Sequence, residues 1–272
     1  MKLRAALFLG FLTCTAWAQT PTIRANAGVL NAASFDANSP ITPGSLFSIF
    51  GTALSSRTAA ADSIPLSNSL GGVTVNFVNG STTLPAPMLY VGPDSASSPS
   101  QINAQVPWNL VPQGTSATVN VIVTRDGVQS APTAVNIGPF SPGIFQSGGQ
   151  AIAVNLDGTL AWAANSIAGL TTHPAKPGDT VIVYATGLGA VDSSPANGAA
   201  SQDKLRFLLT PPQVMIGGLT ATVTFAGLAP QFVGVNQLNV VIPNAAAGAR
   251  VPIQLQLGGI TTSNAITMAV GQ

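Results

Sequence analysis

Hydrophobic and polar residues alternate in many short runs of this chain, which is the pattern of half-buried β-strands. Clear examples are Val73 to Phe77 and Val251 to Leu257. Residues 45–50 and 181–185 are instead apolar on both faces, as expected of central strands. Turn signals such as Asn79-Gly80 separate the runs, and no helical periodicity stands out. The pattern predicts an all-β fold of the sandwich class.

One predicted strand, at residues 101–108, is repeated 136 positions later at residues 237–243. Glutamine, asparagine and proline occupy the same places in both copies, as Gln101, Asn103 and Pro107, then Gln237, Asn239 and Pro243. The flanks repeat as well, since Pro43-Gly44 returns as Pro177-Gly178 and Ser130 returns as Ser263. Because these anchors keep nearly the same spacing, the sequence predicts two related modules in tandem, each with its own core.

The repeated amides have two interpretations. In a strand, Gln101 and Asn103 share one face, and Ile102 and Ala104 share the other. The amides could form a polar binding strip, or they could satisfy backbone groups of a neighbouring loop where the modules meet. The second interpretation is favoured, because a ligand strip seldom needs repeating in a tandem copy. The repeated positions are therefore taken as a structural signature.

The first 18 residues have the features of a secretory signal peptide. Lys2 and Arg4 form a positive start, residues 5–15 are apolar, and Ala16-Trp17-Ala18 is a small-x-small cleavage sequence. Cleavage after this sequence removes the only cysteine, Cys14, so the exported chain has no disulfide. We expect a secreted protein, extracellular or periplasmic, that depends on a hydrophobic core for its stability.

Charged residues are scarce, and this limits the classes of function. They make up 6% of the chain, against about 25% in ordinary soluble domains, and glutamate is absent. No basic residues cluster, which argues against binding to nucleic acid or to anionic membrane surfaces. The mean hydropathy is +0.41, yet after the signal no apolar run reaches the roughly 18 residues that a membrane-spanning helix needs.

A stiff joint at Gly138-Pro139-Phe140 divides the exported chain. We expect the first sandwich over residues 19–139, with a lead-in whose Phe35 plugs one end of the core. The second sandwich is expected over residues 140–272. It begins with an extra hairpin, residues 151–162, that has no obvious counterpart in the first module.

Catalytic and metal-binding chemistry finds little support in the sequence. A secreted hydrolase would have to use His173, the only histidine, and no G-x-S-x-G nucleophile elbow is present, so a loop histidine is favoured. Zinc needs three or four close ligands, and the exported chain supplies neither cysteine nor a second histidine. Asp36 with Asn38 is an incomplete calcium-loop pattern. We therefore expect no catalytic residue, no metal and no cofactor.

Two other groups of residues are candidates for recognition. Trp108, Trp162 and Tyr184 could form a sugar-binding platform, although such residues are more often core or interface anchors. The segment Lys204-Leu205-Arg206-Phe207 has the densest charge of the exported chain and lies in a long loop that matches residues 55–69. If both loops emerge at the same end of their sandwiches, Lys204, Arg206 and Phe207 could join a recognition edge, whereas the plainer interpretation is a solvated loop.

A resemblance to known proteins is carried by residues 31–35, 101–108, 142–145, 184–189 and 226–230. With these segments the chain resembles the IPT/TIG domain, an immunoglobulin-like sandwich. More specifically, it resembles the Solibacter uncharacterised C-terminal domain family of acidobacterial secreted proteins, over nearly all of its exported length. The resemblance implies two tandem immunoglobulin-like sandwiches. The family has no established activity, so the resemblance implies no functional residues.

The sequence thus predicts an exported, non-enzymatic protein made of two IPT/TIG-like sandwiches. Its expected role is surface interaction or adhesion, with a protein or a glycan as partner. Two alternatives remain: a secreted hydrolase that uses His173, and a structural docking module of envelope assemblies.

Overall fold

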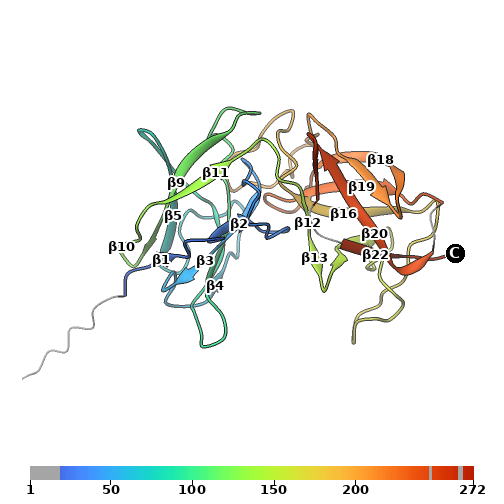
Figure 1. The fold of residues 1–272 in the computed structure, drawn as a ribbon, viewed down its shortest axis with the longest axis horizontal. Coiled ribbons are helices and arrows are strands. Elements are labelled where there is room, and N and C mark those ends of the chain that lie inside the picture. Colours follow the sequence, from blue (N-terminus) through green and yellow to red (C-terminus); the bar gives the residue numbers. More distant parts are fainter. Residues whose placement is uncertain (1–18, 245–246, 263–265) are drawn as a thin grey trace, which may run out of the picture.

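The computed structural model describes residues 19–244, 247–262 and 266–272, so the predicted signal peptide and Ser263 lie outside the described residues. Within these ranges the chain forms strands and turns and no helix. Two lobes lie side by side, with the N-terminal half in one and the C-terminal half in the other (Figure 1). The predicted all-β fold of two tandem immunoglobulin-like sandwiches is confirmed by the strand order described below.

The first lobe consists of two antiparallel sheets. One sheet has the order β1 (Thr22–Ile23), β3 (Leu46–Thr52), β8 (Ser100–Gln105), β7 (Met88–Gly92), β4 (Ala59–Ala60), and β2 (Val29–Asn31) also pairs with β3. The other has the order β10 (Val128–Gln129), β9 (Ala117–Arg125), β5 (Val73–Asn79), β6 (Thr82–Pro85), and β11 (Thr133–Ile137) also pairs with β9. The predicted turn Asn79-Gly80 joins a hairpin, and so does Asp126-Gly127, because the residues on either side of each are paired.

The core of the first lobe follows from the alternation seen in the sequence. Val73, Val75 and Phe77 of β5 are fully buried, while the residues between them are not. Phe77 meets Phe47 of β3 edge-on across the two layers, with ring centroids 5.3 Å apart. Burying one such side chain contributes about 1.5–3 kcal/mol, so the inward set of each strand fixes its register.

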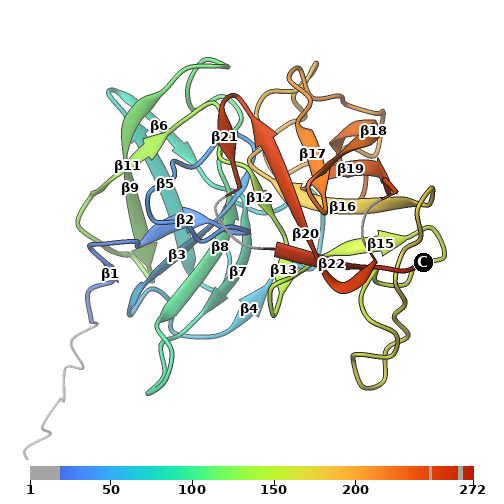
Figure 2. The same cartoon turned by 45° about the vertical axis from the view of Figure 1, so that its right-hand side comes forward.

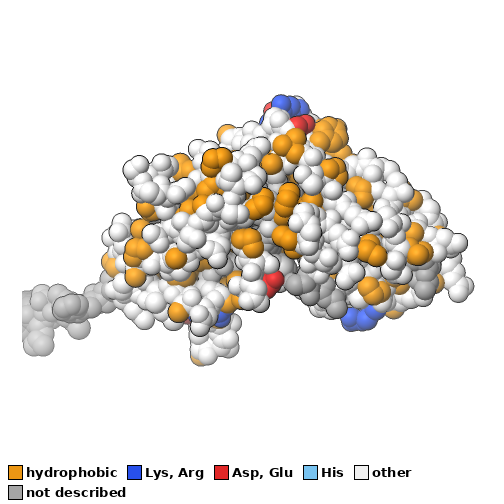
Figure 3. All heavy atoms as spheres, turned by 45° about the horizontal axis from the view of Figure 1, so that its top comes forward, with side chains coloured by type: hydrophobic (Ala, Val, Ile, Leu, Met, Phe, Trp, Pro, Cys, Tyr) orange, Lys and Arg blue, Asp and Glu red, His pale blue; other side chains and the backbone are white. Residues whose placement is uncertain are grey.

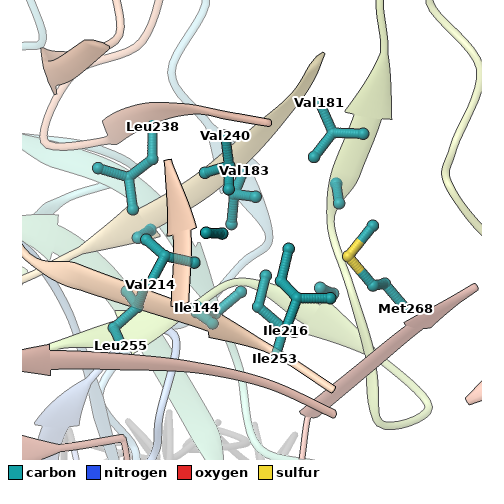
Figure 4. Close-up of a cluster of buried hydrophobic side chains, with 14 of the residues drawn as sticks. Ile144, Val181, Val183, Val214, Ile216, Leu238, Val240, Ile253, Leu255 and Met268 are labelled. Atoms are coloured by element: carbon teal, nitrogen blue, oxygen red, sulfur yellow. The ribbon is translucent and has the colours of Figure 1, made fainter. Parts of the chain in front are cut away.

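The second lobe has one continuous arrangement of strands. The order is β12 (Gly143–Ile144), β16 (Thr180–Thr186), β19 (Asn236–Val241), β18 (Leu219–Leu228), β17 (Gln213–Ile216), β20 (Gly248–Leu257), β22 (Ile266–Val270), β14 (Gln150–Ala151), β13 (Gln146–Ser147), with β15 (Ala153–Asn155) on β16 and β21 (Ile260–Thr261) on β20. The long strand β18 belongs to both layers: its first residues pair with β17 and its last with β19 (Figure 2). Side chains from both layers fill the space between them, including those labelled in Figure 4.

Strand pairing shows how far the duplication extends. β3 and β16 lie at the same place in their sandwiches, as do β8 and β19, β5 and β17, β9 and β20, and β11 and β22. β18 takes the place of β6 and β7 together. The lead-in strands match as well, since β1 and β2 pair with β3 as β12 and β15 pair with β16.

The hairpin expected at residues 151–162 is present, since the Asn155 N–H donates to the Thr159 carbonyl and the Ala161 N–H donates to the Ala153 carbonyl, both at 2.8 Å. Its first strand nevertheless has a counterpart in the first sandwich, because Ala153–Asn155 forms β15, the equivalent of β2. Residues without a counterpart instead form the β13–β14 hairpin, inserted between β12 and β15, and the long segment 156–174 after β15. The sequence did not reveal this counterpart, because β15 is short and has no sequence similarity to Val29–Asn31 apart from its final asparagine.

The two sandwiches are held together by buried side chains. Trp108 follows β8 of the first sandwich, yet its ring packs in the hydrophobic core of the second. Its backbone N–H donates to Asn197 Oδ1 at 2.8 Å. Gln105 is fully buried, donating from Nε2 to the Gly44 carbonyl at 3.2 Å and accepting at Oε1 from the Gly198 N–H at 2.8 Å.

Further hydrogen bonds cross the same junction. The Asn31 side chain donates from Nδ2 to the Ser141 carbonyl at 2.7 Å, and the Leu46 N–H donates to Thr186 Oγ1 at 3.0 Å. Gly187 has a φ of +78°, and a Cβ there would lie 2.0 Å from the Ser141 carbonyl oxygen. A Cβ would also lie 2.8 Å from Asn31 Nδ2 of the first sandwich, so only glycine fits where the Asn31 side chain reaches the Ser141 carbonyl.

Candidate functional site: two aromatic–amide strips

The outward face of one sheet in the first sandwich presents two aromatic and two amide side chains. The first aromatic–amide strip consists of Phe50 on β3, Gln101 and Asn103 on β8, and Tyr90 on β7. Phe50 is paired with Gln101, and Tyr90 is paired with Asn103. All four side chains are half-buried, while Ile102 between the two amides points into the core. The strip therefore crosses three neighbouring strands on the solvent side of the sheet.

The second sandwich has the same arrangement at the equivalent positions. The second aromatic–amide strip consists of Tyr184 on β16, Gln237 and Asn239 on β19, and Phe225 on β18. Tyr184 is paired with Gln237, and Phe225 with Asn239. All four are again half-buried, and Leu238 between the amides lies in the core. The duplication has thus kept both the aromatic and the amide positions of the strip.

Local backbone geometry is also shared by the two strips. A β-bulge immediately precedes Tyr90 in one strip and Phe225 in the other. A glycine follows two residues later, and a Cβ on Gly92 would lie 2.5 Å from Tyr90 Oη, while one on Gly227 would lie 2.7 Å from Phe225 Cζ. Each ring therefore lies over a glycine of its own strand, which holds it flat along the sheet.

Each amide pair is partly satisfied and partly available. Gln101 Nε2 donates to Asn103 Oδ1 at 2.8 Å, and Gln237 Nε2 donates to Asn239 Oδ1 at 2.9 Å. Within the described ranges, no hydrogen bond occupies the Oε1 of either glutamine or the Nδ2 of either asparagine. Each strip therefore offers one acceptor and one donor group, held at fixed positions between two rings.

Exposed phenyl rings extend both strips. Three phenylalanines that are 46–49% exposed pack against strip rings at centroid distances of 5.4–6.1 Å: Phe35 on Phe50, Phe232 on Tyr184, and Phe207 on Phe225.

The expectation that Phe35 plugs a core end is wrong. Its N–H bonds to the Asn31 carbonyl in a tight turn with φ of +51°, which turns the ring outward onto β3.

A groove of about 500 Å³ is lined by residues of both sandwiches. They include Phe232, which packs on Tyr184, and Leu89, the neighbour of Tyr90 in the chain. Ile64, 45% exposed, contributes a further apolar side chain. Few charged groups lie on the surface in general, and Figure 3 shows a face on which hydrophobic side chains are spread across the middle while charges lie at the margins.

The repeated prolines and Gln105 lie outside the two strips. Pro107 and Pro243 follow the ends of β8 and β19. Gln105 satisfies backbone groups of a loop at the module junction, as the favoured interpretation of the amides expected, but Gln101, Asn103, Gln237 and Asn239 face outward instead. The same short motif thus supplies both junction and surface.

The three predicted aromatic residues do not form one platform. Trp108 and Trp162 are only 8% and 7% exposed, and both belong to the second core. Trp162 donates from Nε1 to the Ala151 carbonyl at 2.7 Å. Tyr184 alone lies on an outward face. The tryptophans therefore act as anchors, which is the role that the sequence favoured.

The candidate loop at Lys204, Arg206 and Phe207 needs one correction. Arg206 is buried rather than presented to a partner, with Nη1 and Nη2 donating to both carboxylate oxygens of Asp203 at 2.6 and 3.0 Å. The Arg206 guanidinium lowers the pKa of Asp203 to about 2. Lys204 and Phe207 are exposed, and Phe207 belongs beside the second strip.

The loop of residues 55–69 also contacts the matching long loop of the second sandwich, so the two loops do not form a free recognition edge. The Leu66 N–H donates to the Gly198 carbonyl at 2.8 Å, and both residues are buried at the junction.

His173 forms a surface pair with Asp157, at 2.8 Å between Nε2 and Oδ2. Its other nitrogen, Nδ1, lies 3.0 Å from the Pro174 carbonyl oxygen. Asp157 raises the pKa of His173, and His173 lowers the pKa of Asp157. Since both ring nitrogens face acceptors, neither is available to take a proton from a nucleophile. This geometry does not support the hydrolase alternative.

The described residues contain neither a cluster of metal ligands nor a membrane-spanning helix. Among the described residues, no three His, Cys, Asp or Glu side chains gather as a metal site would require. Asp36 accepts from the Asn38 N–H and the Ser39 hydroxyl, as in an ordinary turn. The described part of the chain also has no helix that is long and apolar enough to cross a bilayer.

Comparison with known proteins gives remote structural likenesses. No protein-family model matches the sequence, and no curated protein matches it. A Bacteroides ovatus protein, mixed-linkage glucan utilization locus SGBP-B in complex with a mixed-linkage heptasaccharide, is 12% identical, with a TM-score of 0.37 over 93% of this chain and 47% of that one. This chain thus spans about half the length of that protein.

Two further solved structures are similar over almost their whole length. Tandem Ig repeats of Dlar are 10% identical, with a TM-score of 0.21 over 93% of this chain and 95% of that one. Domains 5–6 of the S-layer protein SbsC are 9% identical, with a TM-score of 0.26 over 92% and 98%. The assignment of the fold depends on the strand order above, not on these values.

Proposed function

We propose that this is an exported, non-catalytic surface protein that binds glycan chains through its two aromatic–amide strips. One observation supports the proposal above the others: two rings flanking a Gln–Asn pair occur on the outward faces of both sandwiches, at equivalent positions. Packing within each core does not require these residues, because all of them face away from it. Recognition of a ligand gives a reason for their presence in both copies.

The chemistry of the strips suits a sugar. A pyranose ring has apolar C–H faces, which pack on aromatic rings, and hydroxyl groups at its edge, which pair with amides that both donate and accept. Tyr184 with Phe232 and Phe50 with Phe35 supply the rings, and the amides lie beside them. Among the described residues, the cation recorded against a strip ring is Arg24, whose guanidinium lies 5.6 Å from the centre of the Phe50 ring. With so little charge on the strips, we expect a neutral glycan rather than a highly charged one.

The finer assignments belong to the same proposal. We take residues 1–18 as the signal peptide, 19–139 as the first sandwich and 140–272 as the second. We also take the sandwiches to be of the IPT/TIG type and the chain to be a member of the Solibacter family that it resembles. A periplasmic or extracellular location follows from these assignments. Export is checked by N-terminal sequencing of secreted protein, which should begin at Gln19.

Binding is tested with a panel of neutral soluble polysaccharides in affinity gels, followed by calorimetry on the glycan that binds. Tyr184→Ala combined with Phe225→Ala should weaken binding by the second strip at least about tenfold, or about 1.4 kcal/mol. Phe50→Ala combined with Tyr90→Ala should do the same for the first strip.

Gln254→Ala with Gln256→Ala is the matched control, because both amides are exposed on β20 in the opposite layer. Folding of every variant is checked by thermal unfolding. The proposal fails if the wild-type protein binds no glycan of the panel, or if the strip variants bind as tightly as the control.

A further inference from the structure

The outer edge of β11 in the first sandwich is open, whereas the equivalent edge of β22 in the second sandwich is covered by other segments of the chain. β11 and β22 are the last strands of their modules, and each forms a parallel bridge with the preceding segment: Ile41 with Ile137, and Ala175 with Val270. The bonds around these bridges are equivalent, since the Ile41 N–H donates to the Asn136 carbonyl as the Ala175 N–H donates to the Ala269 carbonyl. Ala134 and Asn136 therefore correspond to Thr267 and Ala269.

In the second sandwich this edge is covered by the chain itself. The Thr267 N–H donates to the Gly149 carbonyl at 2.9 Å, where β14 runs parallel to β22. The Ala269 N–H donates to the Ala161 carbonyl at 2.8 Å. Both covering segments belong to the parts that the first sandwich lacks: the β13–β14 hairpin and the long segment 156–174.

In the first sandwich the equivalent donors have no such partner. The Asn136 carbonyl bonds to Ile41, so Asn136 and, two residues earlier, Ala134 direct their backbone groups away from β9. Among the described residues, none accepts a hydrogen bond from the Ala134 or Asn136 N–H on this side. The connections here are also short, because only residues 24–28 join β1 to β2 and only residues 32–40 lead to Ile41.

A groove of about 620 Å³ lies where the missing segments would be. It is lined by Ala134 and Asn136 on one side and by Gly28 and Val29 at the start of β2 on the other. Exposed strand edges are commonly protected by charged side chains, but Arg24 is the one charged residue in the lining. Its guanidinium donates to the carbonyls of its own turn, so it does not close the edge.

We propose that this groove accepts an extended segment of a partner protein, which adds to β11 as a parallel strand. The second sandwich shows the chemistry of the occupant: residues 146–151, Gln-Ser-Gly-Gly-Gln-Ala, have small or neutral polar side chains, and the Gly149 carbonyl accepts from the edge, while the Ala161 carbonyl of the long segment covers the second donor. A partner segment rich in Gly, Ala, Ser and Gln fits a groove with two free N–H donors and almost no charge. This surface meets the first aromatic–amide strip only through Arg24, which lines the groove and lies over the Phe50 ring.

The first experiment is amide hydrogen exchange on the intact protein. The Ala134 and Asn136 amides should exchange at least about tenfold faster than those of Thr267 and Ala269, because only the latter are bonded. Equal protection at all four positions would mean that the edge is already covered and would overturn the proposal.

The second experiment is an NMR titration with a synthetic peptide of the sequence of residues 146–152, up to millimolar concentration. The Ala134 and Asn136 amide signals should shift and their exchange should slow. Ala134→Pro removes the outward N–H without touching the bonds to β9, and should abolish the shift at Asn136. Ala134→Ser, which keeps the N–H, should bind the peptide as the wild type does.

Two outcomes would contradict the proposal. One is a peptide that causes no shift, or shifts that persist in Ala134→Pro while that variant remains folded. The other is concentration-dependent self-association in sedimentation that Ala134→Pro removes, since the occupant would then be a second copy of this chain. A monomeric protein whose edge responds to the peptide supports a separate partner.

Discussion

The two sandwiches are copies, yet the ends of their repeated strands have different tasks. In the first, β8 continues into Gln105 and Trp108, which fit into the neighbouring sandwich. In the second, the position of Gln105 is Val241, a half-buried residue at the end of β19, and no second junction follows it among the described residues. Both copies have the outward strip, but only the first has residues after its repeated strand that pack into the neighbouring sandwich. A repeated motif can therefore keep one structural feature in both copies and differ between them in another.

The largest expected effect comes from Trp108→Ala. The ring lies in the core of the second sandwich, so its loss should cost about 3–5 kcal/mol of unfolding free energy. Denaturant unfolding measures the loss, with Trp108→Phe as a milder control. Hydrogen exchange should show lost protection at Val183 and Leu238 of the second sandwich. Loss confined to the first sandwich would contradict the cross-module role of the ring.

A smaller effect is expected from Gln105→Leu. The substitution leaves the Gly198 N–H and the Gly44 carbonyl without their buried partner, which should cost about 1–3 kcal/mol. The control is Gln101→Leu, at an outward position on the same strand, where the change should stay within about 0.5 kcal/mol. Equal destabilisation by both variants in denaturant titrations would show that the two amides are not divided between junction and surface.

The smallest effect concerns the pair of His173 and Asp157, which has no counterpart in the first sandwich. The raised pKa of His173 gives stability that is present below pH 6.5, its ordinary pKa, and is lost as the pH rises through the raised value. The lowered pKa of Asp157 gives stability that is present above its ordinary pKa of 3.8 and is lost in acid. The pair should therefore contribute most between these values.

NMR titration of the imidazole checks this directly. The pKa of His173 should lie above 6.5 in the wild type and fall towards it in Asp157→Asn. Because both side chains are about half exposed, the change in thermal stability should be small. A pKa that does not respond to Asp157→Asn would contradict the pairing.

Much of the fold could be predicted from the sequence because two-residue alternation and turn residues act locally. Val73, Val75 and Phe77 indicate their inward face by spacing alone, and Asn79-Gly80 indicates the hairpin that follows. The repeat gave the tandem arrangement. The matching of the lead-in strands could not be predicted, because β2 and β15 are only three residues long and are defined by the strand they pair with.

The candidate site was only half visible in the sequence. Gln101 and Asn103 were recognised because the same residue types recur in the second copy. Phe50 and its counterpart Tyr184 are different residue types, and both lie far from the amides along the chain. A signal existed in Tyr90 and Phe225, since each is an aromatic residue two positions before a glycine. Arg206 was misjudged because sequence shows where charge is dense, not whether Asp203 lies close enough to hold it.

The long strand β18 has a mechanical consequence. Because one strand contributes to both layers of the second sandwich, pulling those layers apart requires tearing a continuous ladder, not only separating side chains. In the first sandwich the corresponding path is interrupted at Ala86-Pro87, between β6 and β7. Under tension along the molecule, we expect the first sandwich to yield before the second, so that the C-terminal half keeps its shape for longer.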